Sequence, residues 1–98
     1  MAEQPDDKTL IEMESLLAIV SDYTRLKILY SIIDEEKNVS QIVAEVGASQ
    51  SLVSHQLRVM RKANLVATRK EKTRVYYHLA DDHISSLIEL VHDHVVEK

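Results

Sequence analysis

One change of hydrophobic period most constrains the fold of this 98-residue chain. Up to Asn64 the apolar residues recur at the three- and four-residue spacing of amphipathic helices, whereas residues 65–79 alternate with a period of two. The segments "LVATRKE" and "RVYYHLA" are rich in β-branched and aromatic residues and flank a short polar turn, which predicts a β-hairpin. Residues 81–97 then return to helical spacing. The chain must therefore place one hairpin among helices.

Capping and turn-forming residues divide the helical part before the hairpin into four helices. The first helix is expected over residues 9–20, and Ser21 or Asp22 is expected to cap the second. The third helix is expected to begin after the cap Ser40 and to end at Gly47. The fourth is expected to begin at Ser49 or Gln50 and to end at Asn64. Residues 1–8 are polar and are expected to be flexible. The predicted fold is one domain over residues 1–98, mainly α with a small β part, in the order α-α-α-α-β-β-α. This order is that of a winged helix-turn-helix with one helix added at each end.

The composition favours a homodimer. The chain has no Trp or Phe and only 4 Tyr, so its core must be aliphatic, and a thin core in a short chain is often completed by oligomerisation. No apolar run approaches the ~20 residues of a membrane span, and the acidic start "MAEQPDD" lacks the regions of a signal peptide. The chain is therefore expected to be cytoplasmic, with no membrane partner.

The third and fourth helices, within residues 40–64, predict a helix-turn-helix around the tight turn "VGAS". In such a motif the second helix enters the major groove, where short or bidentate side chains reach base edges and phosphates. The residues predicted to do so are Ser49, Gln50, Ser51, Ser54 and His55. The alternative is that these side chains form an ordinary solvated helix face.

The distribution of charge favours the DNA-binding interpretation. The net charge is −4, yet seven of the twelve Lys and Arg lie within residues 58–74, where Glu71 is the one acid. A basic edge of this kind binds the phosphate backbone, while the acidic remainder limits non-specific binding. The predicted phosphate contacts are Arg58, Arg69, Lys70, Lys72 and Arg74, with the hairpin at residues 65–79 as the wing. Double-stranded operator DNA is the predicted partner.

Three stretches, "SDYTRLKILYSI", "VSQIVAEVGASQSLVSHQLRVMRKANLV" and "RVYYHL", resemble the ArsR/SmtB family of bacterial metal-responsive repressors. The resemblance covers roughly residues 10–97, and it implies a homodimeric repressor that binds a palindromic operator and leaves it when metal binds. Two features depart from the family. The segment "VSQIVAEVG" lacks the cysteines of the family's thiolate site, which excludes arsenic, cadmium and lead sensing through it, and the tip of the wing has no Gly.

The final helix carries groups that bind borderline metal ions at both of its ends. Asp81 and His83 stand at its start and His94 and Glu97 at its end, about 24 Å apart on a helix that rises ~1.5 Å per residue. Two copies of this helix, crossing antiparallel over Leu87 and Leu90, would bring the start of each beside the end of the other. Two nitrogen and two oxygen ligands suit Zn²⁺, which predicts two Zn(II) per dimer, with Co(II) or Ni(II) as possible occupants. The spacing also looks like the interprotomer site of the family's zinc sensors.

The resemblance also implies how metal would act on DNA binding. By family analogy, the non-ligating N–H of His94 donates to a backbone carbonyl near Asn64 and relays metal binding to the recognition helix. Three alternatives stay open: a repressor of the same fold that senses a non-metal signal through a purely structural final helix, an enzyme, and a zinc-storage protein. An enzyme is disfavoured because no HExxH, phosphate loop or nucleophile signature is present, so no small-molecule substrate is expected.

Overall fold

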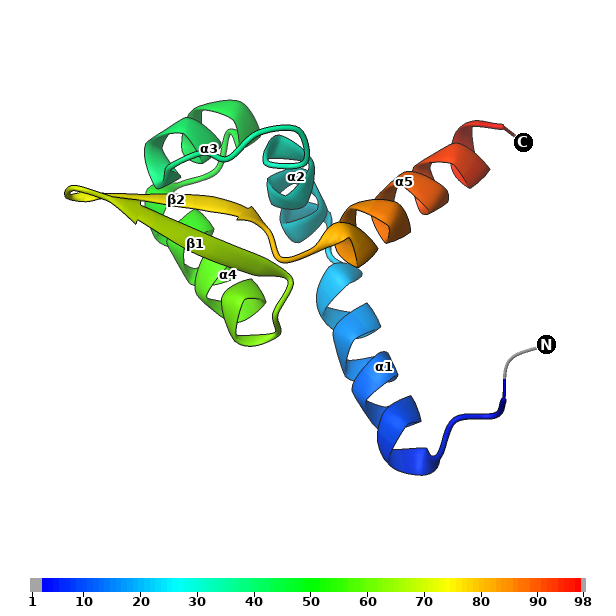
Figure 1. Ribbon diagram of the computed structural model, residues 1–98. Helices are drawn as coiled ribbons and strands as arrows, with labels where there is room; N and C mark the ends of the chain where they lie inside the picture. Colours follow the sequence, from blue (N-terminus) through cyan, green and yellow to red (C-terminus); the bar gives the residue numbers. More distant parts are fainter. Residues whose placement is uncertain (1–2, 98) are drawn as a thin grey trace.

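The computed structural model describes residues 3–97, and it confirms the predicted order of elements and the winged helix-turn-helix fold (Figure 1). The elements are α1 (Asp7–Val20), α2 (Tyr23–Ser31), α3 (Val39–Val46), α4 (Gln50–Lys62), β1 (Val66–Glu71), β2 (Arg74–Leu79) and α5 (Asp82–Val96). The helix-turn-helix is α3 with α4, the hairpin of β1 and β2 is the wing, and α1 and α5 are the added helices.

Side-chain caps set where the helices begin. The carboxylate of Asp6 accepts a hydrogen bond from the Thr9 amide at 2.9 Å, so α1 starts at Asp7, inside the stretch 1–8 that was expected to be flexible. Met1 and Ala2 lie outside the described residues. Asp22 caps α2, as one of the two predicted residues.

The start of α3 and the end of α4 differ from the predictions. Asn38, and not Ser40, caps α3, because the Asn38 and Gln41 side chains each accept a hydrogen bond from the other residue's backbone amide, at 2.9 and 2.8 Å. Gly47 ends α3 with a φ of 77°, as predicted. Asn64 was expected to be the last residue of the fourth helix, but α4 ends at Lys62 and Asn64 adopts a left-handed φ of 60°.

The aliphatic core lies among α2, α3, α4, the start of the wing and the first half of α5. Its most deeply buried members are Ile28, Leu29, Ile32, Ile42, Val53, Leu57, Met60 and Leu65. Ile84 and Ile88 attach α5 to this core. Leu52, on α4, is 39% exposed. None of the residues of α1 is buried.

The wing is an antiparallel hairpin whose strands pair from Val66 with Leu79 to Glu71 with Arg74. Lys72 and Thr73 form its two-residue turn, and Lys72 has a φ of 57°. Without Gly, the turn is therefore made by a lysine in a conformation that L-residues disfavour. The loop before α3 joins this sheet, since the Lys37 amide donates to Tyr77 O at 3.1 Å and the Tyr77 amide donates to Lys37 O at 2.8 Å.

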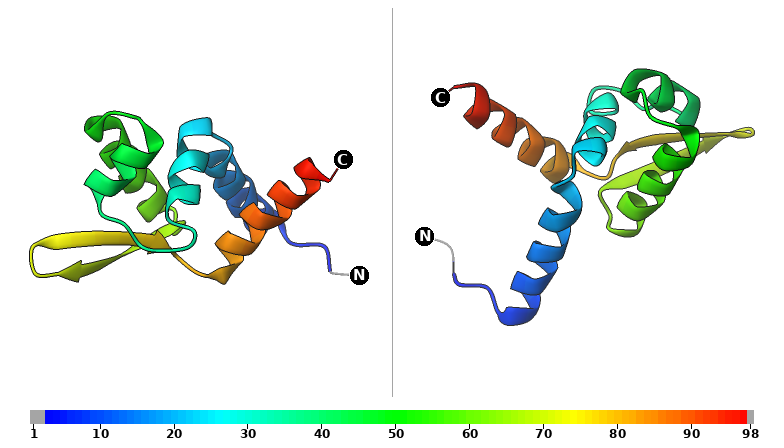
Figure 2. Two further views of the ribbon diagram at one scale, coloured as in Figure 1. Left: turned by 90° about the horizontal axis from the view of Figure 1, so that it is seen from above. Right: turned by 180° about the vertical axis from the view of Figure 1, so that it is seen from behind.

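The two added helices project from the body on the side away from the wing tip. Figure 1 shows the wing and α5 at opposite ends of the molecule, with α1 diverging from α5, and the two views of Figure 2 agree. Many apolar side chains on these helices are exposed: Leu10, Ile11, Met13 and Leu17 on α1, and Leu90, Val91, Val95 and Val96 on α5. Among the residues that the structure describes, no helix is both long and apolar enough to cross a membrane.

Candidate DNA-binding surface and C-terminal metal ligands

The start of α4 presents the predicted base-reading side chains to solvent. Ser49 caps the helix by accepting a hydrogen bond from the Leu52 amide at 3.2 Å, which confirms one of the two predicted starts. Gln50, Ser51 and His55 are exposed and Ser54 is half-buried. The amides and the positive dipole end of the same helix turn also favour contact with phosphate. This surface therefore combines side chains of the kinds that contact base edges with amides suited to bind phosphate.

A buried side of α4 is tied to the preceding helices by Arg25. Its Nε donates to Ile19 O at 2.6 Å and its Nη1 donates to Gln56 Oε1 at 2.7 Å. One guanidinium thus joins the end of α1 to the middle of the helix that carries the DNA-facing residues. This pairing was not predicted, because a single arginine in "TRLK" gives no sign of a partner 31 positions away.

The basic residues of the wing fall into two groups. Lys70, Lys72 and Arg74 are exposed, and no salt bridge links any of them to another of residues 3–97. Arg58, on α4, is exposed as well. These four cations stand where the sequence predicts phosphate contacts.

Arg69 is engaged within the chain. Its Nε lies 2.9 and 3.0 Å from the two carboxylate oxygens of Glu36, its Nη2 pairs with the same carboxylate, and its Nη1 lies 3.0 Å from Glu71 Oε1. Its guanidinium also stacks 5.0 Å from the centre of the Tyr76 ring. The hydrogen bonds from Arg69 lower the pKa of Glu36, and those to Glu36 and Glu71 raise the pKa of Arg69. A phosphate contact by Arg69 stays a prediction, and it would require exchange of these carboxylates.

The first pair of predicted metal ligands converges at the start of α5. Asp81 caps the helix, with its Oδ1 accepting from the amides of His83 at 2.9 Å and Ile84 at 3.3 Å. His83 Nδ1 lies 3.5 Å from the same oxygen, and the His83 side chain is 96% exposed. Because the cap residue is not yet helical, two groups that would diverge on a regular helix point to one place.

The second pair lies at the other end of α5. Both His94 and Glu97 are exposed, and Glu97 is the C-terminal cap residue of the helix. Within the described part of the single chain, no three of the His, Asp and Glu side chains gather as a metal site. No hydrogen bond joins His94 to the segment around Asn64 in residues 3–97 of one chain, so the relay also stays a prediction.

An apolar groove of about 560 Å³ runs between α1, α2 and α5. It is lined by Leu17, Val20, Leu26, Tyr30, Leu87, Ile88, Val91, His92, Val95 and Val96, among others. The Tyr30 hydroxyl lies 3.5 Å from Ile88 O, and burial, with Asp93 and Glu89 nearby, raises its pKa. His92 faces the Tyr30 ring at 6.3 Å between centroids and lies 3.3 Å from Asp93. The groove therefore follows α5 from Leu87 to Val96.

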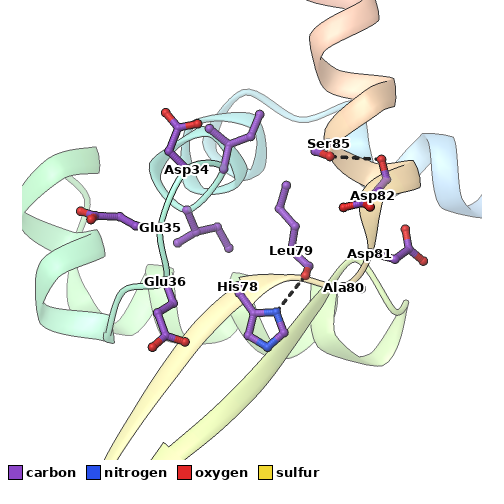
Figure 3. A pocket seen from close by; sticks show the side chains of 11 residues that line it. Asp34, Glu35, Glu36, His78, Leu79, Ala80, Asp81, Asp82 and Ser85 are labelled. Atoms are coloured by element: carbon purple, nitrogen blue, oxygen red, sulfur yellow. Dashed lines mark hydrogen bonds between the residues drawn. The ribbon is translucent and has the colours of Figure 1, made fainter.

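A second pocket, of about 440 Å³, lies where the wing meets the start of α5. Figure 3 shows acidic side chains around it: Asp34, Glu35, Glu36, Asp81 and Asp82. His78 also lines the pocket, with its Nδ1 2.9 Å from Leu79 O. An acidic lining repels phosphate, so DNA is expected at the wing tip and the start of α4 and not on this side.

Comparison with known proteins agrees with the fold. The model of the family described as "Bacterial regulatory protein, arsR family" matches residues 22–68. The chain is 36% identical to the transcriptional repressor SmtB homolog of Synechocystis sp. over 86 residues. The matched stretch covers 88% of this chain and 65% of that relative, just under two thirds of its length.

Two further relatives match over most of both chains. The transcriptional activator HlyU of Vibrio cholerae is 34% identical over 89 residues, 91% of this chain and 82% of HlyU, and a solved structure of it superposes with a TM-score of 0.81 over 89% of this chain and 95% of that one. The homodimeric winged helix-turn-helix domain of Mb0332 from Mycobacterium bovis is 29% identical, with a TM-score of 0.84 over 99% of this chain and 92% of that one. The family is one of regulators, as predicted, and not of enzymes. The chain belongs to the arsR family of bacterial regulatory proteins.

Proposed function

We propose that the chain is a homodimeric transcriptional repressor that binds a palindromic operator and releases it on binding Zn(II), which derepresses genes of metal efflux or detoxification. The observation that carries the proposal is the layout of α5, which has a pair of candidate metal ligands at each end and exposed apolar side chains between them. DNA binding rests on the exposed start of α4 and the exposed cations of the wing.

Dimer formation is supported by the apolar surface of α1 and α5. Leu90 is 69% exposed and Leu17 49% exposed, which one chain alone leaves in water. Covering such surface is favourable by about 25 cal/mol per Å² of apolar area. A second copy is the occupant that the homodimeric relative Mb0332 suggests. The dimer would also complete the thin aliphatic core.

Antiparallel packing of two α5 helices would complete the metal sites. Asp81 and His83 already converge at the start of the helix, and the partner's His94 and Glu97 would supply the other two ligands. Both ligand pairs are exposed, so a metal ion could reach them. Each dimer would hold two equivalent sites with two nitrogen and two oxygen ligands, a set that suits four-coordinate Zn²⁺.

Zinc would act through the shape of the dimer. The two recognition helices must match half-sites one turn of DNA apart, about 34–36 Å. Metal ions that pin the ends of α5 to the partner change the angle between the protomers and hence this spacing. An allosteric coupling of about 1–3 kcal/mol would weaken DNA binding about 5- to 150-fold.

A repressor that senses a non-metal signal is the second candidate. It is favoured by similarity to the biofilm growth-associated repressor of Agrobacterium fabrum, a repressor whose name refers to no metal. In this case α5 would serve only to hold the dimer together.

An operator-binding titration with and without Zn²⁺, near physiological salt, tests the proposal. We expect zinc to weaken operator binding by the wild-type protein and to have no such effect on His94→Ala. His92→Ala is the matched control, since it removes a histidine two positions away that is outside both ligand pairs, and it should respond as the wild type does. Operator binding that zinc leaves unchanged in the wild type would favour the second candidate. A wild-type protein that does not bind operator DNA at all would contradict both.

A further inference from the structure

Two interactions tie the wing to the loop before α3, and one of them engages Arg69, a predicted phosphate contact. These interactions, here called the wing anchor, are the ion pair of Arg69 with Glu36 and the backbone bridge between Lys37 and Tyr77; Glu71, on the same strand as Arg69, adds a second carboxylate beside its guanidinium. We propose that Glu36 and Arg69 are positioning residues that set the direction of the wing for DNA binding. This inference rests on the proposed operator binding and adds two residues that act through the wing.

The wing anchor fastens both strands of the hairpin. The backbone of Lys37 pairs with Tyr77 on β2, and the carboxylate of the neighbouring residue, Glu36, holds Arg69 on β1. Arg69 pairs in register with Tyr76 and stacks on its ring at 5.0 Å. A two-stranded hairpin is only marginally stable by itself, so the isolated bridge at Lys37 and the Glu36 carboxylate tie the hairpin to the loop that precedes α3.

The charge of Arg69 is already compensated. Two carboxylates surround its guanidinium, and with Glu36 the interaction involves both oxygens, a geometry that makes arginine–carboxylate pairs strong and directional. Lys72, by contrast, stands at the hairpin turn about three residues further, or ~10 Å along the strand. The tip is therefore suited to contact phosphate, and Arg69 is suited to fix the orientation of the wing.

The opposite interpretation makes a prediction of opposite sign. If Arg69 binds phosphate, Glu36 is a competitor that masks it, and removing the negative charge of Glu36 should tighten DNA binding. If Arg69 instead fixes the orientation of the wing, removing the charge of Glu36 should weaken DNA binding, although the protein becomes less acidic. The variants Glu36→Gln and Arg69→Gln change the net charge in opposite directions, so a shared loss of affinity cannot come from long-range electrostatics.

The experiment measures operator affinity across a range of salt concentrations for the full chain and three variants. We expect Glu36→Gln and Arg69→Gln each to bind about two- to five-fold more weakly, the range of a well-formed surface ion pair, with the salt dependence of the wild type. Glu35→Gln is the matched control: Glu35 lies in the same loop, its side chain is 75% exposed, and it pairs with Lys37 at 3.8 Å. It should bind DNA at least as tightly as the wild type.

Hydrogen exchange of the free protein checks the anchor itself. The Lys37 and Tyr77 amides, which form the bridge, should exchange faster in Glu36→Gln and Arg69→Gln and not in Glu35→Gln. Tighter DNA binding by Glu36→Gln would overturn the inference. So would a fall of about 0.9 in the salt slope of Arg69→Gln, that is, in the slope of log K for DNA binding against the logarithm of salt concentration, because this is the change expected when one phosphate is no longer neutralised. Unchanged affinity in both variants would overturn it too. Failure of the wild type to bind the operator would instead refute the proposed function, and the two failures are thus distinguishable.

Discussion

The imidazole of His83 lies 3.5 Å from the carboxylate of Asp81 at the start of α5, while the Asp81 carboxylate also accepts a hydrogen bond from the His83 amide at 2.9 Å. This pair is half of the proposed four-ligand set, and the other half stands at the far end of the same helix. A complete site would therefore draw its ligands from two protomers.

Mixed dimers test this sharing of ligands. A dimer with His83→Ala on one chain and His94→Ala on the other places both lesions in one site and leaves the other site whole, so zinc titration should show one intact site per dimer. A dimer with both changes on one chain breaks each site and should show none. Identical zinc binding by the two mixed dimers would contradict antiparallel pairing.

Dimer formation should depend on the apolar residues of α5 and not on metal. Leu90→Asp places a charge on a side chain that is 69% exposed in the single chain, so folding should be little affected, whereas burial of an unpaired carboxylate at an interface is costly. Sedimentation should show a dimer for the wild type without zinc and the 11.2 kDa monomer for the variant. Leu52→Gln, at another exposed leucine, is the control and should stay dimeric. A monomeric wild type would remove the basis of the shared site.

Base reading by α4 should separate from phosphate binding. Gln50→Ala should weaken binding to the operator by about 1–3 kcal/mol, the usual contribution of a bidentate base contact, and should barely affect binding to random DNA. His55→Ala should act in the same direction. Competition assays with both DNAs measure the difference. An equal effect on both DNAs would mean that this helix surface does not read sequence.

The wing tip offers a change that removes charge without disturbing the turn. Lys72 has a φ of 57°, a conformation that costs an L-residue about 1–2 kcal/mol and glycine much less, so Lys72→Gly should leave the hairpin at least as stable. Operator and random DNA should bind more weakly to the same extent, and the salt slope should fall by about 0.9 if Lys72 neutralises one phosphate. Thermal unfolding monitors the hairpin's integrity. An unaltered salt slope would place Lys72 away from the phosphates.

The wing anchor should be sensitive to acid. Hydrogen bonds from Arg69 hold the pKa of Glu36 below its ordinary value of 4.5. A group whose pKa is lower in the folded state stabilises that state above the ordinary pKa, and this contribution is lost as the pH falls through the lowered value. NMR titration of the Glu36 carboxyl should show a pKa below 4.5, and Arg69→Gln should return it towards that value. A pKa of Glu36 that is the same in the wild type and in Arg69→Gln would show that the pair does not persist in solution.

The order of the elements followed from local patterns. The period of the apolar residues changes at the wing, Ser49 and Asp81 are capping residues at helix starts, and Gly47 supplies the left-handed residue that ends α3. These signals act within about four residues along the chain, which is why they can be read from the sequence. The convergence of Asp81 and His83 is also a local feature, because it depends only on the conformation of the cap residue.

Contacts between residues far apart in the sequence were decided by the tertiary structure. The cap of α3 is not one of them, because Asn38 and Gln41 exchange hydrogen bonds across only three positions, a local signal that the prediction of Ser40 missed. Arg69 resembled the other cations of the wing, yet folding brings Glu36, 33 positions earlier, against its guanidinium. Long-range ion pairs depend on how whole elements pack, and hydrophobic period carries no information about them.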